Sequence, residues 1–417
     1  MKVIIAGGGI GGLTAALSLN KIGVDVRVFE SVREVKPLGV GINVLPHASR
    51  ELIALGLQDE LDEFAIRTRQ MAYFTRGGLP VINYPSGQYA GYNWPQYSLH
   101  RGEFQMMLYR VFEERAGKDS ILTGHRLVDF EQDADGVIAR FSGPGSEEVI
   151  HEERGDILVG ADGLHSTVRR QLYPNEGKPV FSKMICFRGA VEGEPYLDGE
   201  TMIVCGDQRL TLVSYPLSKK LHDQGRSLKN WIGAVHFETD QPPEEDWNRE
   251  APAENLLKLY ADWTFDWLDV PGLIASTEQI FEFPVYDRDP LERWTFDRVT
   301  LLGDAAHPLI PVSSSGAVHA ISDGRALAYA LAKNENPLAG LQAYQDDRLP
   351  KANRVVRASR DRGPDEVLDI VMRECPDDMK SVGDHVDLDR LQKVVDDFKD
   401  RTGFAKDKLN SLPSYDP

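Results

Sequence analysis

Three glycines near the start of the chain constrain its fold more than any other feature. Gly7, Gly9 and Gly12 have the spacing G-x-G-x-x-G, after the apolar run Lys2–Ala6 and before a stretch that predicts a helix over 13–22. In such a unit the first glycine makes a tight turn, the second admits a pyrophosphate, and the third lets the helix pack on the strand. The helix N-terminus adds free N–H groups and a positive dipole. The opening residues therefore predict a Rossmann-type βαβ unit that binds a dinucleotide.

An acidic residue supports this interpretation. Glu30 closes a second predicted strand, over 25–30, about twenty residues beyond the turn, where a carboxylate can accept hydrogen bonds from both hydroxyls of an adenosine ribose. The glycines and the acid do not by themselves distinguish FAD from NAD.

Bulk composition excludes several other classes of protein. The chain has 47 Lys and Arg against 65 Asp and Glu, a formal net charge of −18, so we expect no nucleic-acid partner. It has no apolar run of the roughly 18 residues that a membrane span needs, and we expect no stable membrane insertion. Cys186, Cys205 and Cys375 are too far apart for a zinc pattern, which predicts reduced thiols, no metal site and a cytoplasmic protein.

The remaining pattern predicts an α/β fold with an α+β second layer. Between 181 and 283, β-prone runs punctuated by Pro and Gly favour a mainly antiparallel sheet. A buried strand at 299–302 and a long helix over 317–332 return to the first pattern, and the charged end is helical with a final dozen residues that we expect to fray. The expected domains are a discontinuous FAD-binding domain (1–76, 98–180 and 280–342), a substrate-binding sheet domain (77–97 and 181–279) and a C-terminal helical region (343–417).

Two later segments identify a family. The run DILVGADGLHSTVR (156–169) and the run VTLLGDAAHP (299–308) each begin with a predicted strand. They resemble the "DG" and "GD" fingerprints of the class A FAD-dependent aromatic monooxygenases, the salicylate and para-hydroxybenzoate hydroxylase family. The resemblance implies a FAD-binding domain of the glutathione-reductase kind. It also implies that Asp304 holds the ribityl chain of FAD, that Arg101 (in LHRGE) reaches the pyrophosphate, and that Asp162 lies near FAD and the path of the nicotinamide.

The sequence differs from the family pattern in one place. After Pro311 the family carries glycine-rich residues against the flavin ring, whereas this chain has Val312, Ser313, Ser314 and Ser315 before Gly316. We expect the serine side chains to affect the placement of substrate and flavin but not FAD binding itself. The cofactor-binding residues expected in all are Gly7, Gly9, Gly12, Glu30, Gly41, Arg101, Asp162, Asp304, Pro311 and Gly316.

Further segments look like those of the phenazine monooxygenases of pyocyanin biosynthesis, which act on a methylated phenazine carboxylate. They are PLGVGIN (37–43), WPQYSLHRGEFQM (94–106), TMIV (201–204), DWN (246–248) and DRDPL (287–291). They suggest a relative with a planar aromatic or N-heteroaromatic substrate, without fixing that substrate.

What the family does sets the expected chemistry. NADH or NADPH reduces the bound FAD, dioxygen adds to it, and a flavin hydroperoxide hydroxylates an electron-rich ring, possibly with decarboxylation. This mechanism needs no metal, and the absence of a second glycine-rich nucleotide fold agrees with a family that lacks a separate NAD(P)H domain. The sequence leaves open a monomer or a homodimer.

Substrate contacts are expected on the central sheet. Tyr215 and Arg188 lie on predicted strands, where a phenol can hydrogen-bond or deprotonate a ring hydroxyl and an arginine can pair with a carboxylate. The alternative is that Tyr215 packs in the core and Arg188 bridges strands. Asn43, in a loop expected beside the flavin, and Arg209 are weaker candidates.

Other interpretations remain open at this point. His307 could act as a base, but its place in the GD segment favours a structural role, and His47 is expected at a helix start. The family fingerprints are shared with flavin enzymes that epoxidise or perform Baeyer–Villiger insertion, and with flavin-binding proteins that lack hydroxylase activity. An NAD-dependent dehydrogenase is disfavoured by the GD segment.

Overall fold

The computed structural model describes residues 1–36, 41–238, 250–311, 314–376 and 379–417. Ser313, the DWN segment and the first four residues of PLGVGIN lie outside this set. Among the described residues, no helix is long and apolar enough to cross a membrane.

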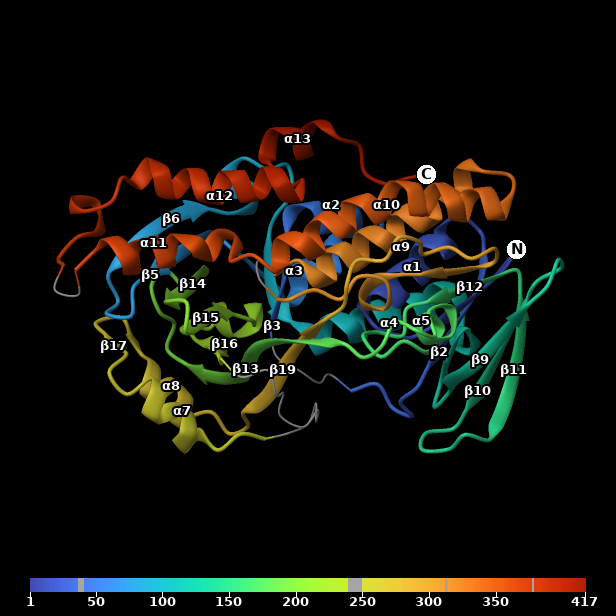
Figure 1. Ribbon diagram of the computed structural model, residues 1–417, viewed down its shortest axis with the longest axis horizontal. Helices are drawn as coiled ribbons and strands as arrows, with labels where there is room; N and C mark the ends of the chain where they lie inside the picture. The colour runs from blue at the N-terminus through green and yellow to red at the C-terminus, as the bar shows by residue number, and fades with distance from the viewer. Residues whose placement is uncertain (37–40, 239–249, 312–313, 377–378) are drawn as a thin grey trace.

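The N-terminal unit is a parallel sheet flanked by helices (Figure 1). Its strands, in spatial order, are β20 (Val299–Leu301), β12 (Ile157–Gly160), β1 (Lys2–Ala6), β2 (Asp25–Glu30) and β8 (Ile121–Thr123). Parallel strands covered on both faces are expected to be apolar throughout, and Val3 to Ile5 and Ile157 to Val159 are fully buried. This confirms the predicted Rossmann-type sheet.

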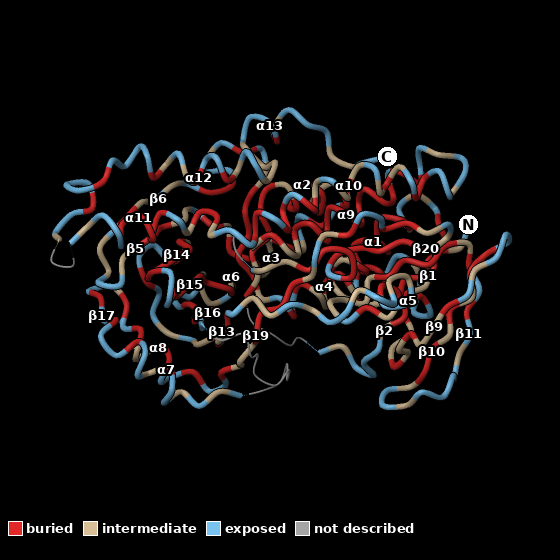
Figure 2. Tube along the Cα trace, in the orientation of Figure 1, coloured by how far each residue is buried: buried red, intermediate tan, exposed pale blue. Residues whose placement is uncertain are grey.

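Helices and a β-meander cover this sheet. The helices α1 (Ile10–Lys21), α4 (Arg101–Ala116) and α9 (Gly316–Lys333) pack beside one another, α1 contacting both of the others. The meander of β9 (Arg126–Gln132), β10 (Val137–Ser142) and β11 (Val149–Gly155) contacts β1, β2 and β12. Figure 2 shows the most continuous burial along α1 and α9 at the centre of this unit.

A seven-stranded, mainly antiparallel sheet forms the second layer. Its strands, in order, are β19 (Phe281–Asp287), β13 (Val180–Gly193), β16 (Ser227–His236), β15 (Leu210–Pro216), β14 (Thr201–Gly206), β5 (Gln70–Phe74) and β6 (Pro80–Pro85). The two faces alternate along each strand. One face packs on α7 (Ala253–Leu259) and α8 (Val270–Ala275), burying Trp231 and Leu212; the other lines a cavity.

This sheet takes strands from beyond the domain limits expected from sequence. β5 and β19 fall within 1–76 and 280–342, which the sequence assigned to the FAD-binding unit, yet β5 pairs with β14 in parallel and β19 pairs with β13. A parallel pair between strands about 130 residues apart leaves no local pattern in the sequence, because no hairpin turn joins them.

Short elements connect the two layers. A three-stranded sheet is formed by β3 (Gly41–Val44), β7 (Tyr97–His100) and β4 (Ile66–Arg67). The helices α2 (Pro46–Ala54) and α3 (Gln58–Phe64) lie between β3 and β4, and α5 (Thr167–Leu172) and α6 (Lys219–His222) follow β12 and β15.

The C-terminal region is helical, as predicted, and reaches across both layers (Figure 1). It comprises α10 (Pro337–Ser359), the short 3-10 turn η5 (Gly363–Asp365), α11 (Glu366–Glu374), α12 (Leu388–Thr402) and α13 (Lys406–Ser411). The prediction that its last residues fray is wrong. Tyr415 donates its N–H to Glu51 at 3.1 Å, and Asp416 accepts from Arg325 at 3.0 Å, because the interior arginine and glutamate need these partners.

Candidate active site

The glycine turn gives each of its three glycines a different environment. Gly7 has φ +110°, and a Cβ there would lie 2.3 Å from the carbonyl oxygen of Ala161. A Cβ at Gly12 would lie 2.0 Å from the carbonyl oxygen of Gly7, so only glycine lets α1 approach the strand this closely. At Gly9, which precedes α1, a Cβ would meet nothing within 4 Å. Open space beside the first N–H groups of α1 suits the pyrophosphate expected there.

Glu30 holds this turn from the end of β2. Its Oε2 accepts from the N–H of Gly8 at 2.8 Å, and its Oε1 accepts from the N–H of Val32 at 3.0 Å and the hydroxyl of Ser31 at 3.0 Å. A carboxylate has about four acceptor positions, so Glu30 retains capacity for ribose hydroxyls. The acid predicted from its spacing therefore also fixes the shape of the turn.

Arg101 and Asp304 face each other across the unit. Arg101 begins α4, and Asp304 lies in the 3-10 turn η3 (Gly303–Ala305) after β20. Both side chains are reached by solvent, although protein surrounds them closely enough to raise the pKa of Asp304 and lower that of Arg101 through desolvation. Their opposite charges attract each other and partly offset both shifts. Two polar side chains that face open space rather than the interior are suited to a polar ligand.

Asp162 of the DG segment accepts hydrogen bonds at the start of a helix. Its carboxylate accepts from the hydroxyl of Ser166 at 2.5 Å and from the N–H of Thr167 at 2.7 Å, at the start of α5. A Cβ at Gly7 would lie 3.1 Å from the Cα of Asp162, so the DG segment contacts the glycine turn through its backbone. The carboxylate itself is directed toward α5.

The two later fingerprints are joined by a residue that the sequence analysis did not single out. Arg169, at the end of the DG segment, is buried and donates from Nη1 to the carbonyls of Ala305 at 3.1 Å and Ala306 at 3.0 Å. Its Nε donates to Glu176 at 2.8 Å. The two carbonyls directly follow Asp304, so the DG segment holds the GD turn in place. Sequence could not show this target, because backbone carbonyls carry no residue signature.

A buried polar network fixes the GD turn from its other side. Asp323 of α9 accepts from the N–H of Gly303 at 3.1 Å, contacts His307 Nε2 at 2.5 Å and accepts from Arg348 at 2.8 Å. Burial raises the pKa of Asp323, but the charges and hydrogen bonds of His307 and Arg348 outweigh this and lower it. This geometry supports the structural alternative for His307. His47 lies at the start of α2, as expected.

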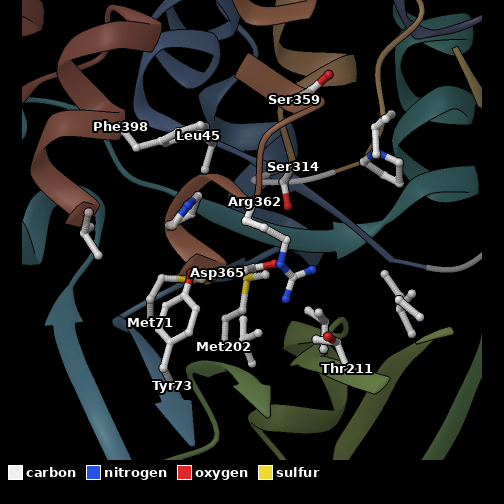
Figure 3. A pocket seen from close by; sticks show the side chains of 18 of the residues that line it. Leu45, Met71, Tyr73, Met202, Thr211, Ser314, Ser359, Arg362, Asp365 and Phe398 are labelled. Carbon is white, nitrogen blue, oxygen red and sulfur yellow. The ribbon is translucent and has the colours of Figure 1, made fainter. Parts of the chain in front are cut away.

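A cavity of about 430 Å³ lies between the seven-stranded sheet, the starts of α2 and α9, and the C-terminal region (Figure 3). Its size is within the range of small-molecule sites. The apolar side chains that line it include Met71, Met184, Met202, Val204, Val213, Ile232 and Phe398.

Tyr215 and Arg188 both line this cavity from the sheet. The Tyr215 ring packs against Gly41, where a Cβ would lie 2.4 Å from it, and Gly41 donates its N–H to Asn230 at 2.8 Å. Burial raises the pKa of Tyr215 by more than the nearby charge of Arg188 lowers it. The net pKa is above the usual value for tyrosine, so the hydroxyl stays protonated near pH 7. Gly41, which the sequence analysis expects to contact the cofactor, is packed against this tyrosine.

Arg188 has no acidic partner among the described residues. Its Nε is buried without a hydrogen-bond partner, and its guanidinium lies 5.4 Å from the ring centre of Phe283. The charge of Arg188 lowers the pKa of Arg101, which begins α4 in the FAD-binding unit. Arg188 therefore lies on the side of the cavity that faces this unit. Arg209, in contrast, is exposed on the turn between β14 and β15 and does not line the cavity.

The start of α9 borders the cavity with Pro311 and Ser314. Ser314 has φ +57°, a left-handed conformation that glycine adopts at lower cost, and its side chain points toward the cavity (Figure 3). Asn43 donates to the Ser314 hydroxyl at 3.4 Å and accepts from Ser98 at 2.6 Å. A Cβ at Gly316 would meet nothing within 4 Å, so this helix start is open, like that of α1.

The sequence analysis missed most of the polar residues that line the cavity, among them Tyr73 on β5, and Arg362 and Asp365 at η5. The C-terminal region was interpreted only as charged helix, and no local pattern indicates which of its charges point inward. The described residues contain no group of three or more potential metal-binding side chains.

This combination of fold and site defines a class. A parallel-sheet unit with an open glycine turn, an acid at the end of β2 and the facing pair of Arg101 and Asp304 has the donors and acceptors that FAD requires. The adjoining apolar cavity provides a place for an organic substrate. The protein is therefore a FAD-binding oxidoreductase of the monooxygenase type.

The chain belongs to the family of FAD-dependent aromatic monooxygenases. The profile of the family described as "FAD binding domain" matches residues 1–188 and 235–359. The chain is 44% identical over 365 residues to phenazine 1,6-dicarboxylic acid hydroxylase PhzS of Lysobacter antibioticus, covering 86% of this chain and 89% of the relative. It is 32% identical over 375 residues to 3-amino-4-hydroxybenzoate 2-monooxygenase PtmB3 of Streptomyces platensis, covering 87% of each.

Solved structures show the same fold. HpxO of Klebsiella pneumoniae, complexed with FAD and uric acid, superposes with a TM-score of 0.75 at 24% identity, covering 99% of this chain and 97% of that one. A salicylate hydroxylase substrate complex superposes with a TM-score of 0.70 at 23% identity, covering 99% and 98%.

Proposed function

We propose that the protein uses NADH or NADPH and dioxygen to hydroxylate a small planar aromatic or N-heteroaromatic carboxylate. The observation that carries this proposal is Arg188: a guanidinium that has no acidic partner among the residues the structure describes and that lines a largely apolar cavity on the side of the FAD-binding unit. Arg188 is only partly buried, but its Nε is shielded from solvent without a hydrogen-bond partner, which is costly, and an anionic group on the substrate would compensate it. The names of the two relatives, a phenazine dicarboxylic acid hydroxylase and a hydroxybenzoate monooxygenase, agree with an aromatic acid.

The cofactor would be held by the residues already described. The open N-terminus of α1 at Gly9 would face the pyrophosphate, Glu30 the ribose, and Arg101 with Asp304 the pyrophosphate and the ribityl chain. The start of α9 at Pro311 and Gly316 would lie against the flavin ring. Bound FAD supplies the redox chemistry, accepting electrons from NAD(P)H and activating dioxygen.

The chain's own residues would then position the ring. Arg188 would pair with the carboxylate through charge-assisted hydrogen bonds. Tyr215, whose raised pKa keeps its hydroxyl protonated, would donate a hydrogen bond to a ring oxygen or nitrogen rather than act as a base. Asn43 would act indirectly, by orienting the Ser314 hydroxyl at the cavity wall. The apolar lining would exclude water from the reacting ring.

The test is substrate-stimulated NAD(P)H oxidation with oxygen uptake, using planar aromatic carboxylates and their neutral amides. Loss of one charged hydrogen bond, about 1.5–3 kcal/mol, predicts that Arg188→Ala weakens carboxylate binding roughly 10- to 100-fold. Amide binding should change little. Arg209→Ala removes an exposed arginine outside the cavity and is the matched control. Equal losses for acid and amide would make Arg188 a structural residue.

Product analysis distinguishes the reaction outcomes. Hydroxylation, epoxidation and Baeyer–Villiger insertion each add one oxygen atom and give isomeric products, which are distinguished by their structures. Hydroxylation with decarboxylation also loses carbon dioxide and is detected by product mass. FAD binding with no stimulated oxygen uptake by any aromatic acid would instead indicate a flavin-binding protein without hydroxylase activity. The use of NAD(P)H and the three free thiols favour a cytoplasmic setting, as a monomer or homodimer.

A further inference from the structure

The C-terminal region forms one end of the cavity and contributes five charged side chains to its lining: Arg360, Asp361, Arg362, Asp365 and Lys399. Three of them are paired with opposite charges outside this set, Arg360 with Asp287 and Asp289, Asp361 with Arg401, and Lys399 with Asp396. The other two lie at η5. Arg362 directly precedes η5 and Asp365 is its last residue, and both side chains point into the cavity, near Met202 and Tyr73 (Figure 3). Their charges interact, because Arg362 lowers the pKa of Asp365.

The positive charge of Arg362 is already compensated. Asp369 of α11 accepts from its Nε at 2.9 Å and its Nη2 at 3.3 Å, and the carbonyl of Asp207 lies 3.5 Å from Nη2. This two-point contact fixes the guanidinium plane and leaves Nη1 without a hydrogen-bond partner among the described residues. Arg362 is thus a rigid donor at the cavity wall, and its pair with Asp369 carries no net charge.

Asp365 adds an acceptor beside this donor. It stands at the N-cap of α11, where an aspartate ordinarily accepts a hydrogen bond from the helix backbone, but its side chain makes no such bond. The hydroxyl of Tyr73 is oriented as a donor toward this carboxylate and lowers its pKa. Burial raises its pKa to about 6, so at pH 8 the side chain is ionised. A single donor at Tyr73 leaves most acceptor positions of this carboxylate available.

The two ends of the cavity therefore differ in charge. Within the described part of the chain Arg188 has no acidic partner, whereas the group of Arg362, Asp369 and Asp365 has one positive and two negative charges when Asp365 is ionised. A carboxylate suits the first end and is repelled at the second, since like charges at close range are strongly unfavourable. The second end suits a neutral group that both accepts, from Arg362, and donates, to Asp365.

We propose that Arg362 and Asp365 form a specificity-determining subsite that takes a neutral hydrogen-bonding group of the substrate, such as a carboxamide, and rejects a second carboxylate. This inference rests on the proposed function, because it assumes that a planar carboxylate occupies the cavity with its acid at Arg188. The proposed substrate of this chain therefore differs from the dicarboxylic acid in the name of its relative, the phenazine 1,6-dicarboxylic acid hydroxylase. The preferred substrate is an aromatic monocarboxylate with a donor–acceptor group at its far end.

Three ligands that differ at one position test the subsite: phenazine-1,6-dicarboxylate, its monoamide, and phenazine-1-carboxylate. Binding to the FAD-loaded protein at pH 8 is followed by the change in flavin absorbance, which does not depend on turnover. We expect the monoamide to bind about 10-fold or more tightly than the dicarboxylate, the discrimination expected of like-charge repulsion. It should also bind more tightly than the monocarboxylate, which lacks the group.

Asp365→Asn removes the negative charge with almost no change in shape, and Asn is also accepted at an N-cap. The monoamide-to-dicarboxylate preference should then fall about 10-fold or more. Glu366→Gln, at the neighbouring exposed carboxylate outside the cavity, should leave the ratio unchanged. Equal or tighter dicarboxylate binding by the unaltered protein, or an unchanged ratio in Asp365→Asn, would overturn the subsite while leaving the proposed function intact. If none of the three ligands binds, the proposed function fails, and the subsite with it.

Discussion

The glycine turn allows cofactor binding and folding to be separated by two substitutions only three residues apart. Gly9 has φ −74° and ψ −180°, which alanine adopts freely, and its added Cβ would meet nothing within 4 Å. Gly→Ala at a compatible site stabilises by about 0.4–1 kcal/mol, and the poorer N-cap preference of alanine opposes this. We therefore expect Gly9→Ala to change the free energy of unfolding of the FAD-free protein by less than about 1 kcal/mol.

The same methyl group would occupy the space beside the first N–H groups of α1, where we place the pyrophosphate. Loss of one charged hydrogen bond costs about 1.5–3 kcal/mol, or roughly 10- to 100-fold in FAD affinity. Gly12→Ala should act differently, because its Cβ would lie 2.0 Å from the Gly7 carbonyl oxygen, about 1 Å inside any real contact. Moving α1 away from β1 is overpacking, which typically costs about 1–3 kcal/mol and sometimes more.

The assay is urea unfolding of the FAD-free proteins, combined with FAD titration by flavin fluorescence. Gly9→Ala should unfold like the unaltered protein but bind FAD weakly, whereas Gly12→Ala should unfold at lower urea and also lose FAD. Gly23→Ala is a comparison variant at a glycine outside the turn; its Cβ also meets nothing, but φ +78° makes it strained. Unchanged FAD affinity in Gly9→Ala would refute the position assigned to the pyrophosphate, and a fully stable Gly12→Ala would refute the packing argument.

Three further predictions follow from the polar contacts. Asp304→Ala should weaken FAD binding by about 1.5–3 kcal/mol with little effect on unfolding of the FAD-free protein; unchanged affinity would mean that the ribityl contact is misplaced. Arg169→Met should lower the free energy of unfolding by about 2–5 kcal/mol, because buried carbonyls of the GD turn lose their donor, and an unaltered unfolding midpoint would contradict this. Asp365 has its pKa raised to about 6, so the folded state holds its proton more tightly than the unfolded state, and this group's contribution to stability falls as pH rises from about 4 to 6. Asp365→Asn should therefore stabilise the protein by roughly 2–3 kcal/mol at pH 8 and by almost nothing at pH 4; a pH-independent difference would argue against a buried carboxylate.

The parts of this molecule that were predictable from sequence are those whose interactions are local in the chain. The strand, turn and helix of residues 2–21 follow from apolar period and glycine spacing, and Glu30 follows from its distance to that turn. The pairing of β5 with β14, the docking of Tyr415 on Glu51 and the choice of Arg362 as a cavity residue are contacts between distant segments. Such contacts are decided by the shape of the assembled layers, which no local pattern encodes.

The fingerprint residues divide into two groups that a motif does not separate. The first group contacts other parts of the protein. Two of its members are glycines that allow close backbone contacts, Gly7 and Gly12, and two make hydrogen bonds to neighbouring segments, Asp162 and Arg169. Gly9, Arg101 and Asp304 instead face open space. The first group holds three chain segments in contact and thereby keeps the second group at fixed positions. Arg101 and Asp304 attract each other, but neither makes a side-chain hydrogen bond within the described part of the chain that would compete with a ligand. Binding of a dinucleotide then requires little reorganisation of these residues, since the first group has already ordered them during folding. A substitution in the first group should therefore reduce stability and affinity together, whereas one in the second should reduce affinity alone.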